Sequence, residues 1–457
     1  MRHWARDSIF YHIYPLGLCG APHRNDFHSP ATPRLEQLYP WIAHLQNLGV
    51  NALWLGPVFE STAHGYDTAD YYSVDRRLGH NRTLSEVISA LHQNGIRVIL
   101  DAVFNHVGRD FWAFRDVREH NERSAYCDWF QDLHFGKRSP FGDPFTYTGW
   151  HSNYDLVKLN LRNPAVKDHL FRAVEMWIQE FDVDGFRLDA ADCIDIDFLK
   201  ELGKLCRSIR SDFWLMGEIV AGDYRKWANA ETLDSVTNYE CFKGLYSSHV
   251  DRNYFEIAYS LKRQFGERGL YCDMPLYNFA DNHDVNRIAS NLINPAHLYT
   301  LYCLLFTMPG IPSIYYGSEW GIQAIRQNGD DSALRPHLDI ATLLQTSPHG
   351  DLVKTISRLA RIRRESLALR YGNYRQLVVR HEQFAFARQT PEECVVVLVN
   401  ASDKPAPFDL AIPDCHCNKL IDLLNPGEEF AVRGGRAKIN VVWPRWARIM
   451  VATRSAD

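Results

Sequence analysis

Short apolar strands alternating with amphipathic helices constrain the fold of this chain most. Between residues 35 and 48, leucine and isoleucine recur at intervals of three and four, which indicates a helix with one buried stripe. The apolar run 52–58 follows that helix, and the same unit repeats as far as about residue 370. Strands joined by helical crossovers run parallel, so this part of the chain predicts a parallel sheet.

Eight segments have the length and β-prone character of buried strands. They are residues 8–16, 52–58, 97–104, 185–189, 213–218, 235–239, 276–280 and 311–316. Eight such units predict an α/β fold of the closed (β/α)8 TIM-barrel type rather than an open doubly wound sheet. No glycine-rich dinucleotide-binding motif follows the first strand, which also argues against the open sheet.

Two helix starts carry capping signals. The segment Thr83-Leu-Ser-Glu86 has the form of a capping box, so we expect Thr83 to open a helix. Asn163 followed by Pro164 combines a favoured cap residue with a first-turn proline, so a second helix is expected there.

Two stretches depart from the alternation. Between His106 and Asn163 it stops within an aromatic-rich segment, and an insertion there would lie on the catalytic face of a barrel. From about Tyr371 short strands replace helices, with Gly434-Gly435 as a hairpin turn. We therefore predict a barrel of residues 1–106 and 163–370, an inserted domain of residues 107–162 after the third strand, and a C-terminal antiparallel β-sandwich of residues 371–457.

Composition narrows the class of partner. The net charge is −5 and the basic residues are scattered, which argues against nucleic acid. Twelve tryptophans suit sugar binding, although barrel cores also use aromatic residues. No secretory signal or membrane-length apolar run is present, and the ten dispersed cysteines favour reduced thiols and a cytoplasmic setting. Cys415-His416-Cys417 resembles half a metal site but has no matching second pair, which favours a surface loop.

Four strand ends concentrate charged and hydrogen-bonding residues. They are the motifs at residues 101–106, 185–191, 217–219 and 279–284. Because the tips of barrel strands share one face, we expect these motifs to form a single site. Carboxylates gathered with an arginine and two histidines are the groups that cleavage of a glycosidic bond needs.

Asp189 and Glu218 are the predicted catalytic pair of a retaining mechanism. Strand alternation puts Arg187 on the same face as Asp189, so the guanidinium is expected to lower the pKa of Asp189 and keep it charged for attack. Glu218 lies one strand later and needs a raised pKa to donate a proton. Gly217 is expected to spare Glu218 from crowding by a neighbouring side chain.

Asp284 ends the seventh predicted strand and is expected to brace the sugar as positive charge develops. His106 and His283 would assist as hydrogen-bond donors. Carboxylates and histidines at barrel tips also build divalent-metal hydrolases. Such sites usually need clustered histidines, for example a His-x-His pair on an early strand, and none is present.

The four motifs, in this order and spacing, resemble the alpha-amylase family of glycoside hydrolases (family 13) across essentially the whole chain. Asp-x-x-x-Asn-His, Gly-Phe-Arg-x-Asp-Ala, Gly-Glu and Asn-His-Asp are all intact. The resemblance implies a TIM barrel with an inserted B domain and a C-terminal β-sandwich. It implies Asp189 as nucleophile, Glu218 as acid/base and Asp284 as transition-state stabiliser. It implies a substrate-binding set of Tyr66, His106, Arg187 and His283.

Within the family, the chain is most similar to the neopullulanase and cyclomaltodextrinase group. The segments His64–Tyr72 and Leu156–Asn160 carry that similarity. It implies hydrolysis of α-1,4-glucosidic bonds in maltodextrins, cyclodextrins or related α-glucans. A 4-α-glucanotransferase using the same covalent intermediate is the alternative, because Val220 and Asp192 depart from the patterns common in related enzymes and the acceptor site decides between the two.

The resemblance also bears on cofactors and partners. The partner it implies is an α-glucan oligosaccharide, with no nucleic acid and no membrane. No cofactor is required, and Asn105 matches a family calcium ligand while an ordinary hydrogen-bonding role at a strand end fits it equally. A monomer and a homodimer are both compatible with the sequence.

Overall fold

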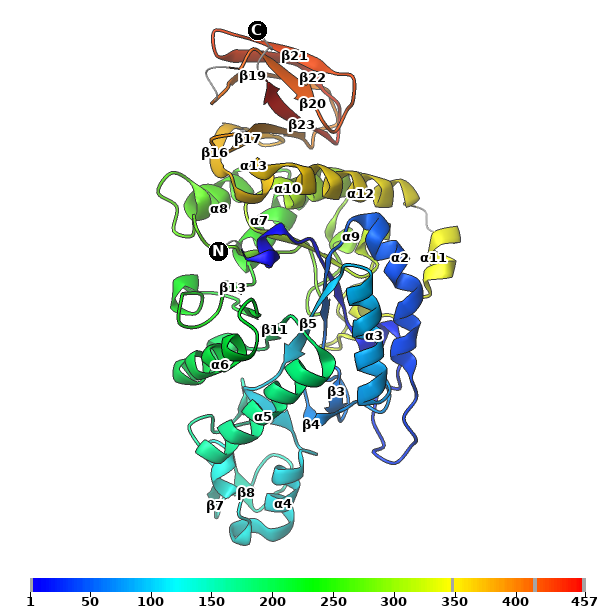
Figure 1. Ribbon diagram of the computed structural model, residues 1–457, viewed down its shortest axis with the longest axis vertical. Helices are drawn as coiled ribbons and strands as arrows, with labels where there is room; N and C mark the ends of the chain where they lie inside the picture. The colour runs from blue at the N-terminus through cyan, green and yellow to red at the C-terminus, as the bar shows by residue number, and fades with distance from the viewer. Residues whose placement is uncertain (1–2, 347–348, 414–416, 454–457) are drawn as a thin grey trace.

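A parallel eight-stranded barrel forms the centre of the computed structural model, which describes residues 3–346, 349–413 and 417–453 (Figure 1). The barrel strands are β1 (Phe10–Ile13), β2 (Ala52–Leu55), β5 (Arg97–Ala102), β11 (Gly185–Leu188), β12 (Trp214–Gly217), β13 (Ser235–Val236), β14 (Tyr277–Asn278) and β15 (Ile311–Tyr315). They are hydrogen-bonded in the order β13-β12-β11-β5-β2-β1-β15-β14, and a parallel bridge between Thr237 and Tyr277 joins the two ends. The predicted barrel fold is confirmed.

Large side chains fill the inside of the barrel, so it is a packed core rather than a pore. His12 stacks on Trp54 with ring centroids 3.5 Å apart, and Phe10 lies 5.1 Å from Trp214. Both faces of each barrel strand are covered, which explains why these segments read as continuous apolar runs rather than alternating ones.

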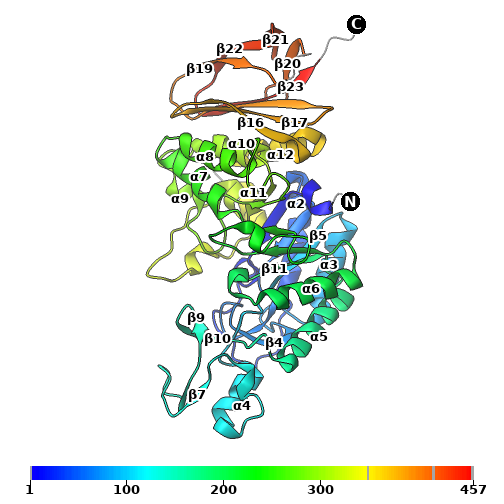
Figure 2. The ribbon, with the colours of Figure 1, turned by 90° about the vertical axis from the view of Figure 1, so that its left-hand side faces the viewer.

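Helices surround the barrel, as Figures 1 and 2 show. They include α2 (Tyr39–Leu48), α3 (Asn81–Gln93), α5 (Pro164–Phe181), α6 (Ile196–Ile209), α7 (Tyr239–Val250), α8 (Phe255–Phe265), α10 (His297–Thr307) and α12 (Gly350–Glu365). Shorter elements are α1 (Pro15–Leu18), α9 (Ile288–Asn291), α11 (Ile340–Thr346), α13 (Leu367–Tyr371), β3 (Phe59–Ser61) and β4 (Thr68–Val74).

The two predicted helix starts have different outcomes. Asn163 caps α5 as expected, since its side chain accepts a hydrogen bond from the Ala165 N–H at 2.8 Å. The prediction that Thr83 opens α3 was wrong, because the helix begins at Asn81 with His80 as its cap residue. Thr83 is the third helical residue, and its hydroxyl accepts a hydrogen bond from the His80 N–H at 3.2 Å.

A small lobe lies between β5 and α5 in the sequence. It contains β6 (His106–Gly108), α4 (Trp112–His120), β7 (His134–Phe135), β8 (Phe145–Thr146), β9 (Gly149–Trp150) and β10 (Asn153–Lys158). Strand β10 pairs antiparallel with both β6 and β9. Phe114 is buried and meets Phe130 and Tyr147 edge to face, both with centroids 5.0 Å apart. Part of the aromatic content of this lobe therefore forms its core.

The C-terminal strands form a separate antiparallel domain. They are β16 (Asn373–Val379), β17 (Gln383–Gln389), β18 (Cys394–Asn400), β19 (Ala406–Ala411), β20 (Lys419–Asp422), β21 (Glu429–Arg433), β22 (Arg436–Val442) and β23 (Trp446–Thr453). Figure 2 shows two layers, with β16 and β17 next to the helices and β19, β21 and β22 farther out. Gly434 and Gly435 turn between β21 and β22 with φ values of 58° and 72°. The predicted β-sandwich is confirmed, and β19, which contains Pro407, lies at a sheet edge.

Two buried arginines donate to the carboxyl end of α10, and one of them, Arg388, joins the C-terminal domain to the barrel. Arg388 of β17 donates to the Thr307 carbonyl at 2.8 Å, and Arg363 of α12 donates to the Phe306 carbonyl at 2.9 Å. These carbonyls lie in the last turn of the helix, where no intrahelical donor is available. Burial lowers the pKa of Arg363 to about 9.

Within residues 3–346, 349–413 and 417–453, no helix combines the length and apolar character that a membrane crossing requires. Cys206, Cys241 and Cys303 are buried free thiols, and burial raises the pKa of each. Cys415 and His416 lie outside the described residues, so the loop expected there stays a prediction.

Candidate active site

Arg187 lies at the centre of the candidate site and contacts three carboxylates. It stands opposite Asp101 in the register between β11 and β5, and its exposed fraction is 1 %. Its Nη1 lies 2.8 Å from Asp101 Oδ1 and 2.8 Å from Asp189 Oδ1. Its Nη2 lies 2.8 Å from Glu218 Oε2. One guanidinium group therefore binds carboxylates at the ends of three neighbouring strands.

Burial sets the protonation of this cluster. It raises the pKa of Asp101 to about 7, and it raises the pKa of Asp189 and Glu218 as well, with the charge of Arg187 opposing the shift in each case. The expectation of a lowered pKa for Asp189 is therefore wrong, because the cost of burying the charge exceeds the attraction of a cation shared by three carboxylates. Closely spaced carboxyl groups of this kind titrate together rather than independently.

The turn after Asp189 brings a backbone donor to Glu218. Ala190 adopts a left-handed conformation with φ 44°, and such a conformation costs a non-glycine residue roughly 1–3 kcal/mol. The Ala190 N–H donates to Glu218 Oε2 at 3.2 Å, and the Tyr239 hydroxyl donates to Oε1 at 3.2 Å. A Cβ on Gly217 would lie 2.5 Å from Leu233 Cδ1, so this glycine admits the leucine rather than relieving Glu218 as expected.

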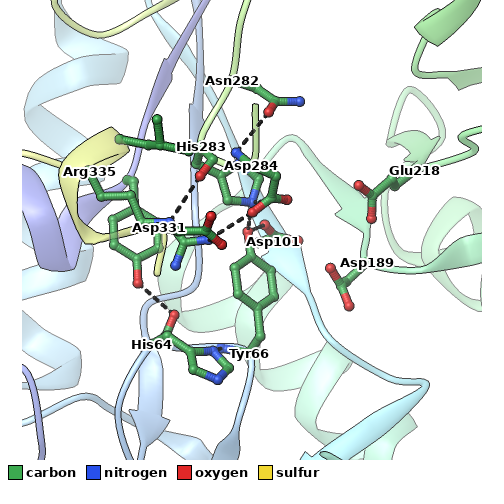
Figure 3. Close-up of polar contacts among 12 residues, drawn as sticks. His64, Tyr66, Asp101, Asp189, Glu218, Asn282, His283, Asp284, Asp331 and Arg335 are labelled. Carbon is green, nitrogen blue, oxygen red and sulfur yellow. Dashed lines mark hydrogen bonds and ion pairs between the residues drawn. The ribbon is translucent and has the colours of Figure 1, made fainter. Parts of the chain in front are cut away.

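Asp284 has a contrasting environment (Figure 3). Arg335 Nη2 lies 2.7 Å from its Oδ1, and His283 Nε2 lies 3.0 Å from its Oδ2. Burial alone would raise the pKa of Asp284, but the interactions with His283 and Arg335 hold it well below its usual range. Asp284 is therefore charged under conditions in which the carboxyl groups around Arg187 still share protons.

Tyr66 connects the two parts of the site. Its hydroxyl donates to Asp101 Oδ2 at 3.0 Å and contacts His283 Nε2. The Tyr66 ring is stacked on that of His283, with centroids 5.4 Å apart and an angle of 15° between the planes. The ring is 8 % exposed, and Figure 3 shows it between His64 and the carboxylates.

His106 presents an unused donor to the site. Asn105 Nδ2 lies 3.1 Å from His106 Nδ1, an arrangement that leaves the ring proton on Nε2. Nε2 is buried without a hydrogen-bond partner and lies 3.7 Å from Asp189 Oδ2. Burial lowers the pKa of His106 to about 3, so the ring is neutral at ordinary pH.

Asn105 has one feature that a metal ligand would have. Its Oδ1 is buried and has no hydrogen-bond partner. In the described part of the chain, however, no group of three or more His, Cys, Asp or Glu side chains is arranged to hold a metal ion. Since calcium needs six to eight oxygen ligands, Asn105 alone does not make a calcium site.

Two cavities lie near Asp284 and its partner Arg335. One of about 560 Å³ is lined by Tyr14, His64 and Arg335. Another of about 630 Å³ is lined by Asp284 and Phe242 among other residues. Asp284 therefore borders one of these cavities directly, and its ion-pair partner Arg335 borders the other.

The structure brings the seven predicted catalytic and substrate-binding side chains together, with Asn105 behind His106. Three polar contacts of the site were not predicted, those of Asp101, Tyr239 and Arg335. Asp101 opens the first strand-end motif, so its place opposite Arg187 could have been inferred from the strand alignment. Tyr239 and Arg335 come from a helix start and a loop, where no sequence pattern fixes their direction.

Comparison with known proteins places this geometry in a family. Residues 38–341 match the family model described as alpha amylase, catalytic domain. A cyclomaltodextrinase from a Bacillus species is 31% identical over 87% of this chain and 73% of its own length. Neopullulanase 2 from Thermoactinomyces vulgaris is 30% identical over 96% of this chain and 76% of its own. A solved cyclomaltodextrinase structure superposes with a TM-score of 0.85 at 27% identity, covering 98% of this chain and 78% of that one. The chain belongs to the alpha-amylase family and is a glycoside hydrolase.

Proposed function

We propose that the protein hydrolyses α-1,4-glucosidic bonds in maltodextrins, cyclodextrins or related α-glucans with retention of configuration. The observation that carries the proposal is the set of three carboxylates on the single guanidinium of Arg187. A retaining mechanism needs a nucleophile and an acid/base roughly 5–5.5 Å apart. The proximity of Asp189 and Glu218, which bind the two terminal nitrogens of one guanidinium group, supports this assignment.

In the first step, Asp189 forms a bond to the anomeric carbon as the glycosidic bond breaks. Glu218 gives its proton to the departing oxygen, which takes the electron pair of the broken bond. In the second step, water attacks the anomeric carbon, loses a proton to Glu218 and releases the Asp189 carboxylate. The two carboxyl groups supply both nucleophile and proton, so the reaction as proposed uses no cofactor.

The remaining residues would stabilise the sugar during these steps. Asp284 is held in its charged form by Arg335 and His283, which suits a carboxylate that faces positive charge at the anomeric centre. The free Nε2–H of His106 is a donor for a sugar hydroxyl. Tyr66 would stack on the ring at the point of cleavage.

The substrate class rests on the relatives, whose names describe enzymes of cyclodextrins and pullulan-type glucans. Transfer of the glycosyl unit to a second sugar uses the same intermediate and is distinguished by its products. The domain boundaries, the cytoplasmic setting and the oligomeric state stay predictions.

Asp189→Asn tests the nucleophile, with Asp168→Asn on the exposed face of α5 as the matched control. We expect the substitution at Asp189 to reduce turnover of cyclodextrin and maltotriose on the order of 10⁴-fold or more, with sugar binding retained. Proton NMR of the first products should show the α-anomer. Retained activity in Asp189→Asn would overturn the assignment, and mainly longer oligosaccharides at high acceptor concentration would identify a transferase.

A further inference from the structure

A chain of hydrogen bonds connects Asp284 to Glu218 across the mouth of the barrel. The Asp284 N–H donates to Asn282 Oδ1 at 2.9 Å, a contact drawn in Figure 3. Asn282 Nδ2 donates to the Tyr239 hydroxyl oxygen at 3.2 Å. The Tyr239 hydroxyl in turn donates to Glu218 Oε1 at 3.2 Å.

The donor and acceptor of each hydrogen bond in this series follow from the first one, which the Asp284 N–H makes. A backbone N–H can only donate, so the oxygen of the Asn282 amide faces Asp284 and its nitrogen faces Tyr239. Because that nitrogen donates to the Tyr239 oxygen, the hydroxyl proton is free to point at Glu218. Asn282 therefore holds the Tyr239 oxygen beside Glu218, where the hydroxyl donates to the carboxylate and can rotate to accept when Oε1 is protonated.

The two oxygens of Glu218 have different surroundings. Oε2 receives the Arg187 guanidinium at 2.8 Å and the Ala190 N–H at 3.2 Å. Both groups donate and neither can accept, so a proton on Oε2 would face two donors. Oε1 has the Tyr239 hydroxyl as its protein partner, and a hydroxyl can rotate to donate or accept. Oε1 is therefore the oxygen suited to carry the exchanged proton.

Tyr239 is held firmly where it makes this contact. It is the first residue of α7, and the preceding Asn238 caps that helix by accepting from the Cys241 N–H at 3.2 Å. The Tyr239 ring meets Phe279 edge to face with centroids 5.0 Å apart, and Phe242 at 6.0 Å. The position of the hydroxyl oxygen is thus set by packing as well as by Asn282.

We propose that Tyr239 is a positioning residue that holds the proton-bearing oxygen of Glu218 toward the scissile bond. This inference rests on the proposed function of Glu218 as acid/base. Tyr239 itself exchanges no proton with the sugar: the proton passes from Glu218 to the departing oxygen and is replaced from water in the second step.

The pH dependence of activity gives a readout that packing alone would not produce. Glu218 faces Arg187 and Asp189 from β11, His283 and Asp284 from the segment after β14, and Tyr239 from α7. A hydroxyl that donates to a carboxylate favours its charged form, so removing the hydroxyl raises the pKa of Glu218. Activity is lost at high pH as Glu218 deprotonates. The alkaline limb of the pH–activity profile should therefore move to higher pH in a variant that lacks the hydroxyl.

Tyr239→Phe tests this proposal, with Tyr259→Phe on α8, a residue that is 69% exposed, as the matched control. We expect kcat/KM for maltotriose to fall about tenfold. The alkaline limb of its pH profile should move to higher pH by about one pH unit, and a pKa shift of that size is equivalent to ~1.4 kcal/mol. With α-maltosyl fluoride, whose leaving group needs no protonation, kcat/KM should change little. Thermal unfolding should match that of the wild type within a few degrees.

Two results together would overturn the role of Tyr239: an equal loss of kcat/KM on maltotriose and on α-maltosyl fluoride, and an alkaline limb of the pH profile that does not move. Glu218→Gln separates this outcome from failure of the proposed function. That variant should lose about 10²–10⁴-fold on maltotriose and retain activity on the fluoride. If Glu218→Gln loses activity equally on both donors, the acid/base assignment itself is wrong, whatever Tyr239→Phe does.

Discussion

Replacing Arg187 by methionine is the sharpest test of the carboxylate cluster. Methionine has a similar length and no charge, so the barrel core stays filled while three carboxyl groups lose their cation. Those groups are Asp101, Asp189 and Glu218, each with an oxygen 2.8 Å from an Arg187 nitrogen. Their pKa values are already raised by burial, and removing the opposing positive charge raises them further.

The expected loss of stability can be estimated from these contacts. Removing one partner of a buried ion pair costs about 3–5 kcal/mol. With an unfolding entropy of roughly 2.1 cal/mol/K per residue, a chain of 457 residues loses about 1 kcal/mol per kelvin near its midpoint. The midpoint of thermal unfolding should therefore fall by about 3–5 °C at pH 8.

The sign of the pH dependence distinguishes this mechanism from simple mispacking. A carboxyl group whose pKa is raised in the folded protein destabilises the fold as pH rises from its unfolded pKa through its folded one. The Arg187→Met deficit should therefore be smaller at pH 5 than at pH 8, because protonation removes charge from the buried carboxyl groups as the pH falls.

Calorimetry at both pH values measures the effect. Arg172→Met removes an exposed ion pair with Asp168 and serves as the matched control, with an expected change of less than about 1 kcal/mol. A midpoint equal to that of the wild type at pH 8, or an equal deficit at pH 5 and pH 8, would refute the reasoning. If Arg187→Met does not fold, Arg187→Lys keeps the charge but cannot reach all three carboxylates, and should show a smaller deficit of the same sign.

Two further predictions concern packing and charge away from the cluster. Gly217→Ala places a Cβ 2.5 Å from Leu233 Cδ1, so thermal unfolding should show a fold destabilised by about 1–3 kcal/mol. An unchanged midpoint would mean that Leu233 moves freely. The hydrogen bond from His92 Nε2 to Asp184 Oδ2, 2.8 Å long, raises the pKa of His92, so its stabilisation is present at low pH and lost as pH rises through that pKa. His92→Gln should therefore reduce the free energy of unfolding more at pH 5 than at pH 9, by about 1 kcal/mol or less. An equal loss at both pH values would exclude a charged His92.

Local patterns predicted the elements better than their ends. The segment 8–16 was expected to be a strand, but β1 covers Phe10–Ile13 and α1 begins at Pro15. Proline at the first helical position favours that early turn. In the C-terminal domain, the hairpin at Gly434-Gly435 was predictable from its turn residues, whereas the four-residue β20 has too few residues to show a period.

The residues of the site likewise fall into those that the sequence could predict and those that it could not. Asp189 and Glu218 could be found because each directly follows a strand, and Asp284 because its motif comes shortly after β14. Parallel strands bring their carboxyl ends to one face. Arg335 and Tyr239 could not be found, because a loop and a helix start have no period that fixes the direction of a side chain. The pKa of Asp189 was predicted in the wrong direction because the sequence pairs it with Arg187 but does not reveal the burial that raises the pKa of this carboxyl group.

The sequence by itself determined the barrel, the order of its strand-end motifs and the residue types gathered at the carboxyl ends. These features depend on periodicity and on neighbours along one strand, which are local properties of the chain. Only the tertiary structure decided how charge is distributed among those residues. Burial and shared partners depend on segments distant in sequence, as Arg335 does beside Asp284 and Tyr239 beside Glu218. The electrostatic energy of a carboxyl group is the sum over all such neighbours, so it is defined once the chain has folded.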